Sequence, residues 1–253
     1  MDSQARRPFR LLWPAGLLTT GLVLAGPLLP GSLRAGPAVQ QTNDTSSSAA
    51  WRTMSSLAFE NWLLDAQTGA PSGPLSDAEW AEFQGALDQD PRTATRAVLV
   101  LAHSGDERVP TVLLERLEQR VIHSARADDS GDCTAAAALG RLGDPQLVGD
   151  RLVDLVHGER PHPDLEVRTE CALGALSLGR REVVPYLLRV LRIDTPSAER
   201  EGRLTDSDVT AWPRGRAAKA LHDLAGWPYS ERTDASVAER EELADRLSQE
   251  LIP

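Results

Sequence analysis

Apolar residues recur along most of this chain with the spacing of amphipathic helices, and the first such pattern begins at residue 51. Its apolar positions fall on one helical face: Trp51, Met54, Leu57 or Ala58, and Trp62. Gly69 and Pro71 then end the pattern, since neither residue favours a helix interior. A single helix is therefore expected in this stretch.

Two capping boxes mark the starts of further helices. Ser76 and Glu79 have the required spacing ahead of the apolar residues Trp80, Phe83 and Leu87. Ser236 and Glu239 have it ahead of a second apolar face: Val237, Leu243, Leu247 and Leu251. These patterns predict an N-terminal helical pair over residues 51–90 and a C-terminal capping helix over 229–253, the latter with one face on its neighbours and one in water.

Between these flanks, residues 91–228 contain four related segments. Each segment ends in a glycine, at intervals of 38, 36 and 47 residues: Gly105, Gly143, Gly179 and Gly226. The longest interval carries an inserted charged stretch near 194–208. Eight residues before each glycine stands a small residue, as close helix packing requires: Ala97, Ala135, Cys171 and Ala218.

Three columns of aliphatic residues follow the first three glycines at offsets of four, nine and twelve. They are Val109, Leu147 and Val183; Leu114, Leu152 and Leu188; and Leu117, Leu155 and Leu191. The columns predict a helix, a tight turn in which glycine permits a positive φ, and a second helix with one buried face. The fourth segment shows no evident leucine-rich second helix.

A single helical pair of this kind cannot bury its apolar face alone, so it stacks on its neighbours. The sequence therefore predicts an all-α fold, an α-solenoid of about four irregular helical hairpins with flanking helices. Low aromatic content, 4 %, and a hydrophobic content of 41 % agree with a closely packed helical core.

Two of the segments, Ala135–Pro145 and Ala172–Arg180, resemble the HEAT-repeat family, in particular its bacterial short-repeat branch named after phycobilin lyases. The resemblance covers roughly residues 92–228. It implies stacked helical hairpins with the second helices lining a concave face. It also implies a protein-binding role, because members of that family share no catalytic residues.

The N-terminal residues 1–38 have the features of a signal peptide. Arg6, Arg7 and Arg10 form a basic start, an apolar run follows, and small residues surround Ala35 and Ala38. Prolines and glycines interrupt the apolar run, so we expect cleavage rather than a retained membrane anchor.

The arginine pair at residues 6–7 also resembles the twin-arginine export signal, with ordinary export as the alternative. Residues 39–50 are polar and are expected to form a disordered linker. The expected location is the periplasm or cell envelope, with secretion as an alternative, and no stable membrane span after cleavage.

Few residues in the sequence suggest a catalytic, cofactor-binding or metal-binding site. The chain contains no GxSxG, HExxH, P-loop or GxGxxG motif, so we assign no catalytic, cofactor-binding or metal-ligating residue and expect no enzyme. His157 and His162 flank Pro161 and are expected to be loop histidines rather than metal ligands. Asp128–Asp132 lacks the glycine and glutamate of a calcium loop and is expected to be a solvated loop that can cap the next helix.

The two cysteines, Cys133 and Cys171, lack zinc-ligand spacing. Buried thiols are the favoured interpretation, with a disulfide as the alternative.

Two surface clusters could contact a partner. One is a basic cluster that could meet an acidic partner, with an ordinary solvated helix face as the alternative interpretation: Arg180, Arg181, Arg189 and Arg192. The other is aromatic and is expected to seal the last repeat against its cap: Trp212, Trp227 and Tyr229.

The formal net charge is −10, and Lys219 is the single lysine. So acidic a chain repels a phosphate backbone, and no nucleic-acid partner is expected. The sequence thus predicts an exported scaffold or adaptor that binds a protein partner. The alternatives are a phycobilin-lyase-like or other small-molecule-handling protein, and a membrane-anchored structural envelope component.

Overall fold

The computed structural model describes residues 50–252 except 66–68, 124–129, 194–205 and 230–235. The expected signal peptide and all but the last residue of the expected linker lie outside these residues. The described helices are, in chain order, α1 (Ala50–Thr53), α2 (Ser56–Leu64), α3 (Asp77–Ala86), α4 (Pro91–Ser104), α5 (Val109–His123), α6 (Ser130–Leu142), α7 (Leu147–His157), α8 (Leu165–Ser177), the 3-10 helix η2 (Arg181–Val183), α9 (Val184–Leu191), α10 (Asp206–Ala225) and α11 (Val237–Leu251).

The described part of the chain is all-α and contains no strand, which confirms the all-α part of the prediction. No helix in it combines the length and the apolarity that crossing a membrane requires.

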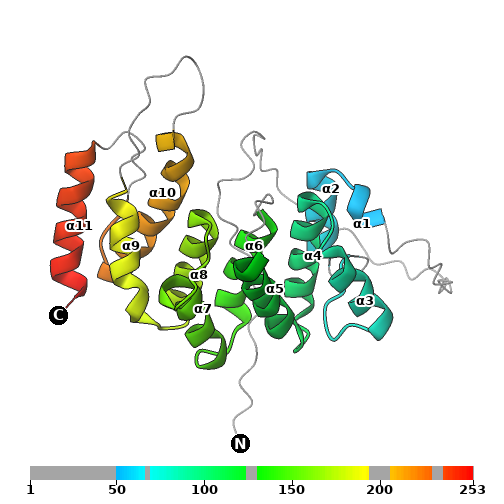
Figure 1. Cartoon of the computed structure of the whole chain (residues 1–253). Coiled ribbons are helices and arrows are strands. Elements are labelled where there is room, and N and C mark those ends of the chain that lie inside the picture. The colour runs from blue at the N-terminus through cyan, green and yellow to red at the C-terminus, as the bar shows by residue number, and fades with distance from the viewer. Residues whose placement is uncertain (1–49, 66–68, 124–129, 194–205, 230–235, 253) are drawn as a thin grey trace, which may run out of the picture. The chain divides into compact units, whose positions relative to one another are not determined.

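The helices form two rows, in which alternate helices of the chain pack on one another (Figure 1). In the first, α4 packs on α6, α6 on α8, and α8 on α10. In the second, α5 contacts α7, α7 contacts η2, and α9 contacts α11. Each helix of the first row also contacts the next helix along the chain.

The predicted single helix after residue 51 is wrong: α1 and α2 are separate, with a break at Met54 and Ser55. The Ser55 hydroxyl accepts a hydrogen bond from the amide of Ala58 at 3.2 Å and so begins a new helix. The Arg96 guanidinium of α4 donates to the carbonyl oxygens that α1 leaves unpaired, including that of Trp51 at 2.8 Å. This break rotates Leu57 outward, where it is 67 % exposed.

Both predicted capping boxes are confirmed. Phe83 of α3 and Leu87, which follows that helix, are buried as predicted. In α11 the buried residues are Ala244 and Leu247, and Val237 is 38 % exposed. α11 packs against both α9 and α10. It therefore takes the second-helix position beside α10, which the sequence pattern left without a helix.

Three of the four turn glycines have the predicted positive φ, namely 65° at Gly105, 87° at Gly179 and 70° at Gly226. Gly143 does not, and its role is steric: a Cβ atom there would lie 2.5 Å from the Cγ1 atom of Val148. Glycine is thus required for space at this turn.

The predicted aliphatic columns are buried with one exception. Leu147 is 63 % exposed, and Val148 occupies the buried position instead. The Asp144 carboxylate accepts hydrogen bonds from the amides of Gln146 and Leu147 at 2.8 and 2.9 Å, and this turn shifts the register by one residue.

The small-residue column is fully buried at Ala97, Ala135 and Cys171. In the fourth segment the prediction is wrong by one residue: Ala217 is fully buried and Ala218 is not. The buried stripe of α10 passes through Ala217 and Leu221, one turn apart, so that Ala218 lies beside it.

In the first row, α6 and α8 approach each other closely. A Cβ atom built on Gly140 would lie 2.5 Å from the Cα atom of Gly174. The Ser177 hydroxyl donates to the carbonyl oxygen of Gly140 at 2.7 Å across the same crossing. The two glycines therefore allow backbone-to-backbone packing at this point.

Candidate functional site

A groove of about 420 Å³ lies between α5, α7 and the turn that follows α7. Val121 and Ile122 of α5 and Leu155 of α7 supply its apolar lining. Leu155 is buried, Val121 is partly buried, and Ile122 is 62 % exposed. The groove thus combines a closed apolar floor with one large apolar side chain open to a partner.

The local sequence explains why the groove is apolar. The buried face of α5 contains Leu113, Leu114 and Leu117. Val121 continues this face one turn later, but Ile122 falls just outside it because the helix advances about 100° per residue. Ile122 was not singled out from the sequence, since an isolated β-branched residue at a helix end gives no distinctive signal.

Charged residues of both signs surround the apolar lining. Across one side, Arg151 of α7 donates from Nε and Nη2 to the two carboxylate oxygens of Glu118 in α5, at 2.7 and 2.6 Å. Asp154, Glu159 and Arg160 are exposed at the other side. The bidentate ion pair between Arg151 and Glu118 fixes the spacing of α5 and α7, and the exposed charges remain accessible to a partner.

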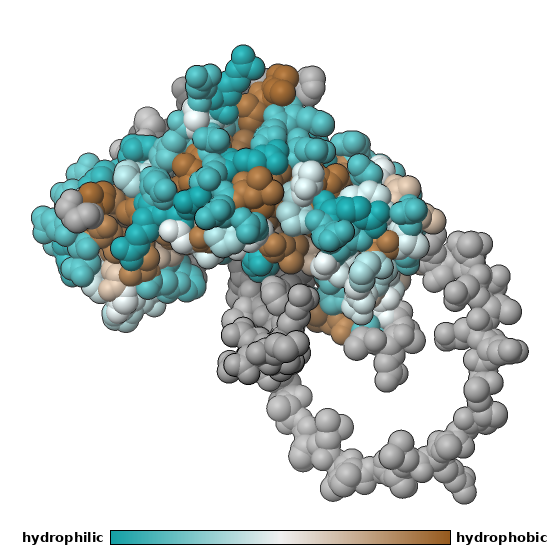
Figure 2. Space-filling model, turned by 90° about the horizontal axis from the view of Figure 1, so that it is seen from below, coloured by the Kyte–Doolittle hydropathy of each residue, from teal (hydrophilic) through white to brown (hydrophobic). Residues whose placement is uncertain are grey.

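Several apolar side chains are exposed in the described part of the chain, and the face seen in Figure 2 has small apolar patches separated by polar ones. The large ones are Leu57, Leu64, Ile122, Leu147, Trp212, Val237 and Ile252. Ile122 is the member of this set that lines the groove.

The two histidines expected in a loop have different environments. His157 is the last residue of α7 and is exposed. His162 is 2 % exposed and is held in the turn by three contacts. Its Nδ1 atom accepts from the amide of Asp164 at 3.2 Å, its amide donates to Leu155 at 2.8 Å, and its carbonyl oxygen accepts from Arg168 Nε at 2.7 Å.

Burial lowers the pKa of His162 below its ordinary value of 6.5. Asp132 of α6 and Asp164 of the turn oppose this shift, and Arg168 of α8 reinforces it. As the pH falls, the unfolded chain therefore binds a proton at His162 before the folded protein does. The free energy of unfolding keeps its full contribution from the neutral ring above pH 6.5. This contribution is lost as the pH falls from 6.5 towards the lower pKa of the folded protein.

We predict that wild-type protein loses more stability than the His162→Asn variant between pH 7.5 and pH 5. Asparagine can keep an acceptor for the amide of Asp164 but does not titrate. The measurement is urea unfolding at both pH values, and the other histidines cancel in the comparison. An identical pH dependence in the two proteins would contradict the assigned burial of the neutral ring.

Asp132 does not lie in a solvated loop, contrary to the expectation for Asp128–Asp132. It is in the first turn of α6 and is 1 % exposed. Arg116 of α5 donates from Nε to its Oδ1 atom at 2.7 Å, and Arg120 Nε lies 3.5 Å from its Oδ2 atom. This ion pair holds the Asp132 carboxylate in the interface of α5 and α6. Residues 128–129 lie outside the described part of the chain.

Both cysteines are free thiols, and the favoured prediction of two buried thiols holds fully for Cys171 alone. Cys171 is fully buried and Cys133 is partly buried. Burial is the largest cause that raises the pKa of each thiol well above its ordinary value, and nearby Glu170 adds to the effect. Neither thiol is therefore available as a thiolate nucleophile at neutral pH.

The basic cluster does not form one uniform face. Arg180 pairs with Asp150 of α7, and Arg192 pairs with Asp245 of α11 at 2.6 Å. Arg181 and Arg189 are exposed. Two of the four arginines thus connect neighbouring helices, which leaves two for an acidic partner.

In the aromatic cluster, Trp227 packs partly buried against the core beside α11, as the sealing prediction requires. The Tyr229 hydroxyl donates to the carbonyl oxygen of Gly215 at 3.3 Å. Trp212 differs, because it is 37 % exposed beside Arg216.

Among the described residues, no three His, Cys, Asp or Glu side chains come together as metal ligands. No protein-family model, curated protein or solved structure matches this chain.

Proposed function

We propose that this chain is an exported α-solenoid of HEAT-like helical hairpins that acts as a protein-binding scaffold. The packing of alternate helices on one another and the positive φ of Gly105, Gly179 and Gly226 support the repeat interpretation. The signal-peptide pattern of residues 1–38 supports export.

The observation that carries the binding proposal is the groove between α5 and α7. Its apolar floor, the 62 % exposure of Ile122 and its charged rim have the composition of a small protein-interaction site. The groove also lies on second helices, the row that the HEAT resemblance assigns to the concave binding face.

The occupant that fits best is a segment of a partner protein with one large apolar side chain between charged residues. The apolar side chain would pack on Ile122, Val121 and Leu155. A basic residue of the partner would meet Asp154 or Glu159, and an acidic one Arg160. Charges of both signs on the rim give such a segment a preferred direction.

The test is quantitative cross-linked capture from the native host with three baits: wild type, Ile122→Asp, and Leu147→Asp as the matched control. Leu147 is also in the second-helix row and is 63 % exposed, but it does not line the groove. We expect Ile122→Asp to weaken partner binding at least about 10-fold, because a desolvated carboxylate would face the apolar floor. Leu147→Asp should bind like the wild type.

A protein set that is retained by Leu147→Asp and lost by Ile122→Asp would support the proposal. Capture that is equal for all three baits would overturn the groove assignment. Capture of nothing above an empty bait would overturn the scaffold function. Circular dichroism and thermal melts confirm that each bait is folded.

A further inference from the structure

We propose that the pocket between α10 and α11 binds a small organic carboxylate with an apolar body of about one ring. The proposal rests on residues that do not line the groove between α5 and α7, so it stands or falls independently of the scaffold function.

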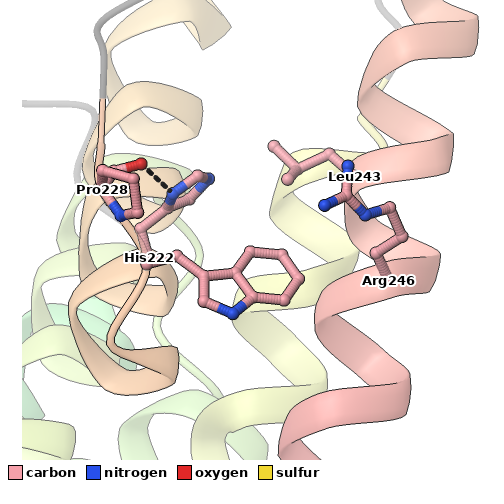
Figure 3. A pocket seen from close by; sticks show the side chains of 5 residues that line it. His222, Pro228, Leu243 and Arg246 are labelled. Atoms are coloured by element: carbon pink, nitrogen blue, oxygen red, sulfur yellow. Dashed lines mark hydrogen bonds between the residues drawn. The ribbon is translucent and has the colours of Figure 1, made fainter.

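The pocket has a volume of about 300 Å³, at the lower end of the range for small-molecule sites. Its apolar walls are Trp227 and Pro228, which follow α10, and Leu243 of α11. Two polar side chains complete it, His222 from α10 and Arg246 from α11. Figure 3 shows these two facing each other across the space between the helices.

Arg246 supplies the positive charge of the pocket. Its guanidinium carbon lies 5.1 Å from the centroid of the Trp227 ring, a cation–π contact that leaves the N–H edges of the guanidinium uncommitted. Within the described part of the chain no carboxylate lies within ion-pair distance of it. Arg192, which also contacts α11, differs because it pairs with Asp245 at 2.6 Å.

His222 is held in a fixed orientation on the opposite wall. Its Nδ1 atom lies 3.1 Å from the carbonyl oxygen of Pro228, and because a carbonyl oxygen only accepts, Nδ1 carries the proton. The ring also packs edge-on against Trp227, with centroids 6.0 Å apart. Nε2 is then the ring nitrogen that this contact leaves open to the pocket.

These features select the ligand class. A guanidinium fork matches the two oxygens of a carboxylate. The exposed carboxylates of Glu241 and Glu242, in the same turn of α11 as Leu243, disfavour a doubly charged anion such as phosphate through repulsion. The walls formed by Trp227 and Leu243 favour an apolar body over a bare anion.

The experiment titrates the full chain with benzoate, and with benzamide and acetate as probes that lack the charge or the ring. Ligand-observed NMR and tryptophan fluorescence give the affinities. We expect benzoate to bind with a Kd on the order of 1 mM, as a small pocket allows, and each of the other probes at least about 10-fold more weakly.

Two variants assign the site. Arg246→Gln should weaken benzoate binding at least about 10-fold, because it removes the charged half of the contact. The matched control Arg192→Gln should leave benzoate binding unchanged. Arg246 is exposed, so the variant is expected to stay folded, and a thermal melt checks this. Equal binding of benzoate and benzamide, or wild-type affinity in Arg246→Gln, would overturn the proposal.

Discussion

Gly140→Ala is expected to lower the free energy of unfolding by about 3 kcal/mol, through overpacking at the crossing of α6 and α8. The added methyl group would lie 2.5 Å from the Cα atom of Gly174 and 2.8 Å from the Ser177 hydroxyl oxygen. Backbone atoms cannot turn aside as a flexible side chain can, so the two helices must separate. Urea denaturation followed by circular dichroism measures the loss.

The matched control is Gly85→Ala, also in a helix but with nothing within 4 Å of the new Cβ atom. Alanine restricts the unfolded chain and favours helix, so this variant is expected to gain about 0.5–1 kcal/mol. The opposite signs separate steric cost from helix propensity. If Gly140→Ala were as stable as the wild type, the close approach of α6 and α8 would be refuted.

Asp132→Asn is expected to lower the free energy of unfolding by about 3–5 kcal/mol, the typical cost of leaving one member of a buried ion pair without its partner. The Arg116 side chain is 7 % exposed and that of Asp132 is 1 % exposed. Arg116 also donates to the carbonyl oxygen of Leu87 at the end of α3. The variant therefore leaves the buried Arg116 guanidinium, where α3, α5 and α6 meet, with the exposed Asp88 carboxylate at 3.5 Å as its remaining counter-charge.

Asp245→Asn is the control for the same chemical change at an exposed ion pair. The Arg192 and Asp245 side chains are 36 % and 67 % exposed, and water screens such pairs, so the expected loss is below about 1 kcal/mol. The double variant Arg116→Met/Asp132→Leu removes both buried charges and should recover part of the stability lost by Asp132→Asn. Equal losses for Asp132→Asn and Asp245→Asn would contradict the burial of the first pair.

Arginine bridges recur at the interfaces between neighbouring helices. Arg151 joins α7 to α5, and Arg216 of α10 donates to both carboxylate oxygens of Glu170 in α8, at 2.8 and 2.9 Å. Arg96 of α4 donates to the carbonyl oxygen of Trp51 in α1. A planar guanidinium can bond two acceptors at once, which an ammonium group cannot do with fixed geometry. The near absence of lysine from this chain agrees with this use of arginine.

Much of the helical framework was predictable because its signals are local. The capping boxes at Ser76 and Ser236 act within one turn of the backbone, and the structure contains both. The aliphatic columns record a period that any buried helix face must have. The break between α1 and α2 was missed because the Ser55 cap is only half of its cause, and the other half is Arg96, more than forty residues away from the carbonyl oxygens to which it donates.

The groove and the pocket were not predictable, because each is formed by side chains from separate helices. Ile122 has no distinguishing mark in the sequence, and its place beside Leu155 depends on the packing of α5 against α7. Arg246 became a candidate ligand only through its position over Trp227. Charge pattern alone pointed instead to a basic cluster that includes Arg180 and Arg192, both of which the fold pairs with carboxylates.

The sequence by itself determined that this protein is helical, where α3 and α11 begin, and which leucines face inward at all but one of the predicted positions, since helix period and capping act over a few residues. Tertiary structure decided the register at Leu147 and Val148, the glycine contact between α6 and α8, and the partner of every buried charge. Those features depend on which helix surfaces meet, and distant segments settle that together when they pack.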